Sequence, residues 1–418
     1  MVRKFFCKVY GSTLVKSSGI YTIVNFLNKV FPFILLPILS RELSLEEFGE
    51  FSIYRTSISF CIPLVGLSLS EFIIRKFFEN LNVHYISTII IQVIANSIIL
   101  LTISLFYSEF ILTLMGMDSI MFSSAIIIAL STCVNNIHRG ILRCVNNNSF
   151  FAVLVLGQSI LYFLVIFCSY WFFGISLFLA VIVEVIVFVI FSSVSVYLLY
   201  RKYGFSLKFK KSYLKEGLNY SSPLFLNSIM IYSFALLDRY IINYQLGSQD
   251  VALYVGVFQL ASIFQVLGSS FNSAWFPWVF KYLSSKPSIN LIIRYNFYIL
   301  LIFLFLSLIF LAVCYSLVEP VLGAKFLNGR ILLYGFVSAI FFQIIYWIFS
   351  PVIQYTKNNW ILTYPIIPIL LLSLILNLVF LSQYGILFAS FVYSLSWFIL
   401  ASITIFYSIK ITNGIQTV

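Results

Sequence analysis

Three basic residues lie deep inside long apolar runs of this chain, where an ionisable side chain is rarely placed without a function. Lys29 lies near the middle of the first apolar run, Arg55 lies in the second and Arg239 in the seventh. A charge at the centre of a membrane helix costs about 2.5–3.5 kcal/mol on insertion scales, so such residues usually face protein or water. Cations gathered around one cavity need an anion to offset them, and a phosphate group fits this chemistry. The residues therefore predict a cationic cavity that binds a phosphate-bearing substrate.

Lys29 belongs to a polar stripe on one predicted helix. Tyr21, Asn25 and Lys29 follow one another at intervals of four residues, which places them on one helical face. Lys29 is too deep to reach a membrane surface easily, so we predict that it binds substrate with Asn25 beside it. Arg55 and Arg239 have a second explanation, because each lies near enough to the outer end of its helix to extend its side chain to the surface.

Two acidic residues, Glu184 and Asp238, also lie inside apolar runs. Glu184 either pairs with a cation such as Lys29 or binds a proton, and the sequence does not decide between these roles. Asp238 points about 100° away from its neighbour Arg239 on a helix, and either joins two helices or takes part in ion binding. Both acids are candidates for coupling transport to a gradient of H⁺ or Na⁺. No other cofactor is expected.

Arg139 and Arg143 lie four residues apart at the inner end of the fourth apolar run. Basic residues at this position are well explained as determinants of membrane topology. A second interpretation is that they contact an anionic lipid headgroup at the cytoplasmic surface.

The composition is that of an integral membrane protein. Of 418 residues, 61% are hydrophobic and only 9% are charged, and the mean hydropathy is +1.05. A soluble domain cannot bury so much apolar surface, whereas lipid is a solvent for it. The net charge of +12 would suggest nucleic acid binding in a soluble protein. Here the basic residues fall mostly between apolar runs, where they act as topology signals.

Twelve apolar runs are long enough to cross a membrane, for which about 20 residues are needed. The first run is too long for a removable signal peptide and lacks a cleavage site. The predicted spans are 18–40, 50–73, 84–107, 119–142, 150–172, 175–200, 219–243, 252–275, 291–316, 331–354, 360–382 and 385–409. Basic and acidic residues alternate between successive gaps, which predicts that both termini are cytoplasmic.

The spans divide into two predicted lobes of six helices, residues 1–205 and 206–418. The longest inner gap, residues 201–217, is rich in lysine and separates the sixth span from the seventh. An offset of 203 residues aligns the turn after the first span of each half, so that Leu43 meets Leu246 and Glu47 meets Asp250. Because six spans return the chain to its starting side, this is a parallel repeat, an architecture typical of transporters.

Neither a metal site nor a disulfide framework is predicted. The six cysteines include no CxxC pair and have no histidine at ligand spacing.

Three short segments resemble Wzx-type polysaccharide flippases of the MATE/MOP superfamily. Residues 37–51 (PILSRELSLEEFGEF) are similar to the outer turn of that family, and residues 237–247 (LDRYIINYQLG) are similar to its seventh span. A third match is the serine and asparagine of residues 373–379, followed by Tyr-Gly-Ile at 384–386. These motifs cover about a tenth of the chain, while the layout of spans matches over its whole length.

The resemblance implies two six-helix lobes around a cationic central cavity, in the bacterial inner membrane. The implied cargo is an undecaprenyl-diphosphate-linked oligosaccharide, such as an O-antigen repeat unit of lipopolysaccharide, moved from the cytoplasmic to the periplasmic leaflet. The implied partners are this lipid-linked substrate, membrane lipids, a polysaccharide polymerase and a chain-length regulator, with no nucleic acid. The chain is then a transporter and not an enzyme.

Two other functions are weighed against this one. A multidrug exporter of the same superfamily would favour deep carboxylates for its cationic cargo, and the excess of deep cations argues against it. A membrane polysaccharide polymerase is expected to carry a large periplasmic loop, and no outer gap here exceeds roughly fifteen residues.

Overall fold

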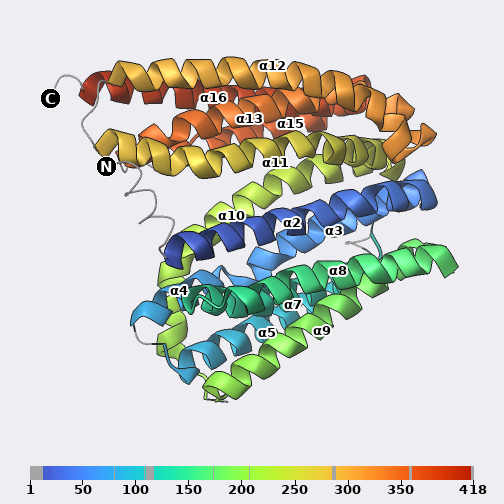
Figure 1. Cartoon of the computed structure of the whole chain (residues 1–418). Helices are drawn as coiled ribbons and strands as arrows, with labels where there is room; N and C mark the ends of the chain where they lie inside the picture. The colour runs from blue at the N-terminus through green and yellow to red at the C-terminus, as the bar shows by residue number, and fades with distance from the viewer. Residues whose placement is uncertain are drawn as a thin grey trace. The chain divides into compact units, whose positions relative to one another are not determined.

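The computed structural model describes residues 13–79, 81–107, 109, 117–172, 174–206, 208–284, 289–356 and 360–415. Within these ranges every regular element is a helix (Figure 1). The helices are α2 (Thr13–Glu42), α3 (Leu45–Gly66), α4 (Leu69–Glu79), α5 (Val83–Phe106), α7 (Ser119–Cys144), α8 (Asn148–Phe172), α9 (Leu177–Tyr203), α10 (Lys211–Leu246), α11 (Ser248–Ser284), α12 (Ile289–Leu322), the 3₁₀ helix η1 (Ala324–Gly329), α13 (Leu332–Tyr355), α14 (Trp360–Thr363), α15 (Ile366–Tyr384) and α16 (Ile386–Ile415). The chain is an all-α membrane protein, as its composition predicts.

Each predicted span coincides with a long helix or with two shorter ones, α3 with α4 and α14 with α15. Nine helical segments of the described chain are long and apolar enough to cross a membrane, and the bent pair α3–α4 would make ten. The helices α2 and α10 fall outside this set, and both contain proline within the helix. The side of the membrane on which the termini lie stays a prediction from the charge pattern.

The described chain forms two compact units, Met1–Leu236 and Leu237–Val418. The division falls inside α10, whereas the lobe boundary predicted from sequence lies after residue 205. The first half of α10 packs with the first unit: Lys76 of α4 forms an ion pair with Glu216 at 2.6 Å, and Tyr85 of α5 stacks on Tyr213. The hydrogen bond from Lys76 lowers the pKa of the Glu216 carboxyl, which favours the charged form in this pair.

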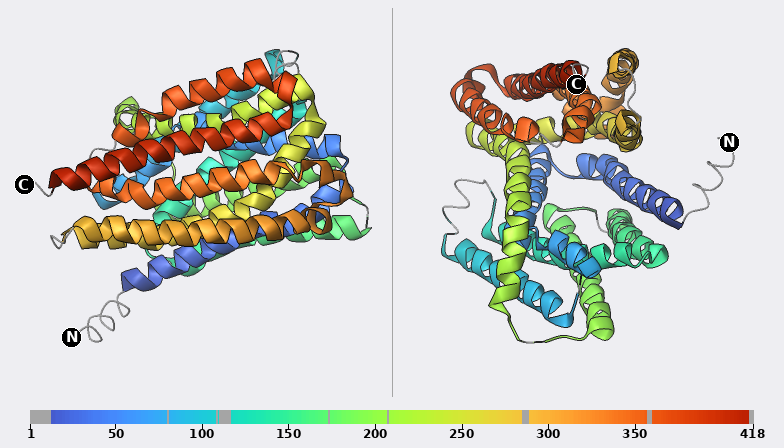
Figure 2. Two further views of the ribbon diagram at one scale, coloured as in Figure 1. Left: turned by 90° about the horizontal axis from the view of Figure 1, so that it is seen from above. Right: turned by 90° about the vertical axis from the view of Figure 1, so that its left-hand side faces the viewer.

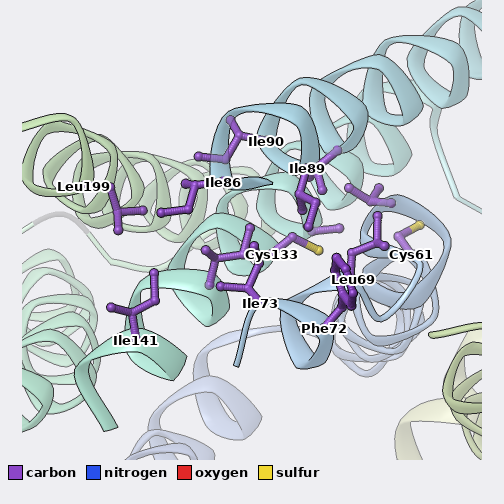
Figure 3. Packing of buried hydrophobic residues seen from close by; sticks show 14 of the residues in the cluster. Cys61, Leu69, Phe72, Ile73, Ile86, Ile89, Ile90, Cys133, Ile141 and Leu199 are labelled. Carbon is purple, nitrogen blue, oxygen red and sulfur yellow. The ribbon is translucent and has the colours of Figure 1, made fainter. Parts of the chain in front are cut away.

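In the first unit α7 is the central helix. It packs against α3, α4, α5, α8 and α9. Half of the residues in its most apolar 18-residue stretch are buried, compared with 22–33% in the corresponding stretches of α5, α8 and α9. Side chains of α3, α4, α5, α7 and α9 meet in an apolar core that includes Cys61, Phe72, Ile89, Cys133 and Leu199 (Figure 3). This core fixes α7 against its neighbours along residues 126–141.

In the second unit α13 has the same role. It packs against α11, α12 and α16 (Figures 1 and 2). Of the residues in its most apolar 18-residue stretch, 72% are buried. Both α7 and α13 belong to the fourth of the six predicted spans in their half of the sequence. Two units with the same central position are what a parallel repeat predicts.

The helix ends carry further signs of this repeat. The 203-residue offset that aligns the outer turns also aligns the first residues of α3 and α11, Leu45 and Ser248. Gly174 and Gly385, which precede the last helix of each half, both have positive φ, at 76° and 67°. Phe173, which precedes Gly174, lies outside the described residues.

The start of α3 is fixed by its own sequence. Ser44 accepts a hydrogen bond from the backbone of Glu47, and the Glu47 carboxylate accepts one from the backbone of Ser44. This capping box satisfies two backbone donors that the helix leaves free. The first of the quoted motifs therefore has a local structural role.

The predicted continuous span 50–73 is broken in the structure. The helices α3 and α4 meet at a bend of 47°, and Leu67 and Ser68 between them both have positive φ, at 47° and 53°. Two such non-glycine residues in succession are strained. Pro63 in the last turn of α3 removes one backbone donor and weakens the helix there.

Side chains from neighbouring helices cover the backbone carbonyls at this break. Asn96 of α5 donates to the carbonyl of Val65 at 3.0 Å, and Ser221 of α10 donates to that of Ser68 at 3.2 Å. Because polar backbone groups must be satisfied within a membrane, these contacts stabilise a break that the sequence of α3 and α4 alone would not hold.

Candidate functional site

Two arginines and one glutamate meet in a cavity of about 160 Å³ in the first unit. We call this cavity the arginine pocket. Its polar lining includes Arg55 of α3, Thr132 and Arg139 of α7, Gln158 and Tyr162 of α8, and Glu184 of α9. With Asn28 of α2, the pocket gathers polar side chains from five apolar helices.

Arg55 and Glu184 form the one ion pair of this pocket that the described residues show, with 3.4 Å between Nη2 and Oε1. The side chain of Glu184 is 2% exposed, so its charge has almost no access to solvent. The Arg55 guanidinium also lies 5.6 Å from the centre of the Phe51 ring and 6.0 Å from that of Tyr162. The ion pair and the aromatic rings together hold Arg55 within the protein.

Arg139 is positioned by α7 and α8. Its Nη2 donates to Oε1 of Gln158 at 2.6 Å. On α7 it lies seven residues after Thr132, which places both side chains on the same helical face. From sequence Arg139 and Arg143 had the same interpretation, but the structure separates them: Arg139 lines the pocket, and Arg143 is exposed at the end of α7.

Four buried polar atoms of the pocket residues have no hydrogen-bond partner among the described residues. They are Oγ1 of Thr132, Nε of Arg139, the hydroxyl of Tyr162 and Oε2 of Glu184. An unsatisfied buried polar group costs about 1–3 kcal/mol. Donors and an acceptor left free around one cavity are the arrangement expected of a site that receives a polar ligand.

The described side chains give the pocket a net charge of +1, since two arginines face one glutamate. Arginine binds phosphate and carboxylate through two parallel hydrogen bonds, so this excess charge favours an anion with several oxygens. The pocket can therefore hold a ligand by charge and hydrogen bonding.

Lys29 and Asn25, the residues predicted to bind substrate, lie on α2. The helical backbone is described there, but both side chains lie outside the described part of the structure. Their neighbour Asn28 does line the arginine pocket, and it accepts a hydrogen bond from Ser159 of α8. The role of Lys29 and Asn25 stays a prediction.

Asp238 and Arg239, the other predicted residues, belong to the second unit and do not line the arginine pocket. Asp238 is 5% exposed, and its carboxylate accepts hydrogen bonds from Nδ2 of Asn377, at 3.0 Å, and from the hydroxyls of Tyr254 and Ser373. Arg239 is its nearest charged neighbour. The third sequence motif therefore supplies Ser373 and Asn377 to the acid of the second motif.

Two hydrogen bonds join α11 to α13 in the second unit. Gln265 of α11 donates to Gln343 of α13 at 2.8 Å, and the indole of Trp275 donates to the carbonyl of Ile348 at 3.0 Å. Polar contacts of this kind hold neighbouring membrane helices together. Over the described residues no three His, Cys, Asp or Glu side chains lie together as metal ligands would.

Sequence analysis did not identify Thr132, Gln158 or Tyr162 as candidate site residues. Gln158 and Tyr162 follow one another at an interval of four residues on α8, and this polar pair in an apolar run was a usable signal. Thr132 shares the helical face of Arg139 in the same way. The pairing of Arg55 with Glu184 could not be read from sequence, because 129 residues separate them along the chain.

A family model described as polysaccharide biosynthesis protein matches residues 14–283. The chain belongs to this family. A relative from Haemophilus influenzae, Lsg locus putative protein 1, is 28% identical over 283 residues, which are 65% of this chain and 67% of that protein. The family and the apolar helices make the chain a multi-pass protein of the bacterial inner membrane.

Solved structures with the same fold are membrane transporters. The lipid II flippase MurJ in an inward closed conformation is similar with a TM-score of 0.78 and 14% identity, over 95% of this chain and 90% of that one. An inward-facing multidrug resistance transporter of the MATE family in the MOP superfamily is similar with a TM-score of 0.69 and 14% identity, over 95% of each chain. This chain therefore has the fold of these transporters, as its motifs predict.

The ion pair of the arginine pocket can be tested by stability. Arg55 is 35% exposed, but removing it leaves the buried Glu184 charge without a partner. Arg55→Met is therefore expected to destabilise the protein by about 2 kcal/mol, less than the loss of a partner from a fully buried pair. Arg55→Met with Glu184→Gln should recover most of this loss, because neither charge is then left alone. Thermal unfolding of the purified protein in detergent measures both.

Equal unfolding temperatures of the single and double variants would contradict the ion pair. Arg143→Met serves as the matched control, since this exposed arginine on α7 should leave the unfolding temperature unchanged.

Proposed function

We propose that this chain is a flippase that carries an undecaprenyl-diphosphate-linked oligosaccharide from the cytoplasmic to the periplasmic leaflet. The observation that carries the proposal is the arginine pocket, with its net positive charge and its unsatisfied polar atoms within an apolar bundle. The family and the fold support a transporter of lipid-linked precursors.

In this proposal the arginine pocket binds the diphosphate. Arg55 and Arg139 donate to its oxygens, while the free hydroxyls of Thr132 and Tyr162 add neutral hydrogen bonds. Glu184 holds Arg55 in place and limits the excess charge to one unit. A site with both arginines uncompensated would bind a diphosphate more tightly and release it more slowly, so the carboxylate favours turnover.

The hydrophobic tail needs no pocket in this mechanism. The polyprenyl chain stays in lipid, where each buried methylene stabilises it by about 0.8 kcal/mol, and only the polar headgroup crosses through the protein. Access from the two leaflets in turn, by motion of one six-helix lobe against the other, is the mechanism typical of parallel-repeat transporters.

We assign ion coupling to Asp238 and not to Glu184. Glu184 already has Arg55 as its partner. Asp238 instead receives uncharged donors from Asn377, Tyr254 and Ser373, and Oδ1 of Asn377 has no partner among the described residues. Arg239 is the charged residue that acts on this carboxylate, and the groups that hydrogen-bond to it are neutral and bear oxygen, a set that suits a proton or a Na⁺ ion.

The finer parts of the proposal concern the pathway. An O-antigen repeat unit is the proposed cargo, as in Wzx-type flippases, and a polysaccharide polymerase and a chain-length regulator are the proposed partners. The similarity to a multidrug transporter favours one competing function, the export of cationic drugs. A net-positive pocket opposes such cargo.

The in vivo test uses the gene deletion with plasmid complementation. Wild type is expected to restore polymeric surface glycan on a gel, whereas Arg139→Gln should reduce it at least tenfold because the pocket loses its excess charge. Arg143→Gln, one helical turn further along α7, should restore glycan fully.

Unchanged glycan in the deletion strain, accompanied by new sensitivity to cationic drugs, would contradict the flippase and support an exporter. Equal glycan with Arg139→Gln and Arg143→Gln, at equal protein levels, would remove the arginine pocket from the account.

The coupling assignment predicts different behaviour of the two acids. In proteoliposomes an imposed Na⁺ or H⁺ gradient should accelerate transport by wild type and by the control Asp250→Asn, but not by Asp238→Asn. Glu184→Gln should keep the response to the gradient even if its rate is lower. A full response by Asp238→Asn would show that coupling lies elsewhere.

A further inference from the structure

A second cavity, of about 300 Å³, lies at the break between α3 and α4 in the same unit. We call it the kink pocket. It is lined from α3, α4, α5, α7 and α10, and its polar lining consists of Ser68, Ser70, Glu71, Asn136, Asn227, Ser228 and Tyr232. Nothing in the proposed role of the arginine pocket uses these residues.

The chemistry of the kink pocket is unlike that of the arginine pocket. Among its described lining residues Glu71 is the one that is charged at neutral pH, and no lysine or arginine is present. The other polar groups are hydroxyls and amides, which both donate and accept hydrogen bonds. Apolar surface from Pro63, Val93 and Leu224 completes the lining. A diphosphate is therefore a poor ligand here, and a polyhydroxyl compound is a good one.

The two pockets share two helices. Arg55 and Ile62 lie on the same face of α3, and seven residues of helix separate them by about 10 Å. On α7, Arg139 lines one pocket and Asn136 lines the other. When a diphosphate is bound in the arginine pocket, a group attached to that diphosphate can thus reach the kink pocket.

The break in the backbone belongs to the kink pocket. Ser68, one of the two residues with positive φ, lines it directly, and so does Gly66. A Cβ atom at Gly66 would lie 2.7 Å from Sγ of Cys133, so this glycine lets α3 and α7 approach closely here. Strained backbone that neighbouring helices hold in place is typical of ligand sites.

We propose that the kink pocket binds an uncharged sugar residue of the lipid-linked headgroup. This inference rests on the proposed function and adds a substrate class to it. Asn136 and Asn227 bind the hydroxyl or acetamido groups, Glu71 accepts from a pair of hydroxyls, and the apolar lining contacts the C–H face of the ring. A uronic acid is excluded, because its carboxylate would face that of Glu71 with no cation to offset it.

Three lipids test this proposal on the purified full-length protein. They are undecaprenyl diphosphate alone, the same lipid bearing one N-acetylhexosamine, and the same lipid bearing one hexuronic acid. For wild type the N-acetylhexosamine should tighten binding about tenfold relative to the sugar-free lipid, and the hexuronic acid should not. The Asn136→Ala/Asn227→Ala protein should lose the sugar-dependent increment and bind the sugar-free lipid as wild type does.

Binding of the sugar-free lipid also shows that the double variant is folded. The matched control is Ser222→Ala, at an exposed position on α10. An unchanged sugar increment in the double variant would overturn the proposal, and so would an equal increment for the uronic acid. If wild type binds no form of the lipid, or if Arg139→Gln leaves the affinity for the sugar-free lipid unchanged, the proposed function fails instead.

Glu71→Gln gives a second, independent readout. This variant should tighten binding of the hexuronic acid lipid at least fivefold and change the affinity for the N-acetylhexosamine lipid by less than threefold. No gain for the hexuronic acid lipid would show that Glu71 does not set the preference for an uncharged sugar.

Discussion

The structure of the first unit depends on keeping an unequal set of charges inside apolar helices. Glu184 is buried, and Arg55 is the cation that faces it, while Arg139 adds a second positive charge that no described carboxylate offsets. Charges in such a place are stable only when other polar groups surround them. Within the protein, Arg139 is stabilised by its hydrogen bond to Gln158, and Arg55 by the aromatic rings beside it. An anionic headgroup would offset the positive charge that is left.

The central helix α7 positions both pockets. It is held by the apolar core along residues 126–141 and packs against five other helices, so its side chains have little freedom to move. One of its faces presents Thr132 and Arg139 to the arginine pocket, and the neighbouring face presents Cys133 and Asn136 to the kink pocket. A rigid helix shared by two binding surfaces fixes the distance between them, as recognition of a two-part headgroup requires.

The fold could be predicted from sequence because membrane helices leave a strong signal. Each predicted span coincides with one long helix or with two shorter ones, and the paired outer turns predict the repeat. The break between α3 and α4 was not predictable in this way, because its carbonyls are satisfied by Asn96 and Ser221 from distant parts of the chain. The site was predictable only in part: Arg55 and Glu184 were recognised as deep charges, but their pairing depends on how α3 packs against α9. The sequence pattern favoured Arg139 as a topology signal, because its hydrogen bond to Gln158 depends on how α7 packs against α8.

The most direct test of this account is a flipping measurement with purified protein in proteoliposomes. A fluorescent undecaprenyl-diphosphate-linked oligosaccharide is placed in one leaflet, and its arrival in the other is followed by quenching from outside. The account predicts transfer by wild type and by Arg143→Gln, and at least tenfold slower transfer by Arg139→Gln. Transfer by Arg139→Gln at the rate of wild type, or no transfer by wild type above protein-free liposomes, would contradict it.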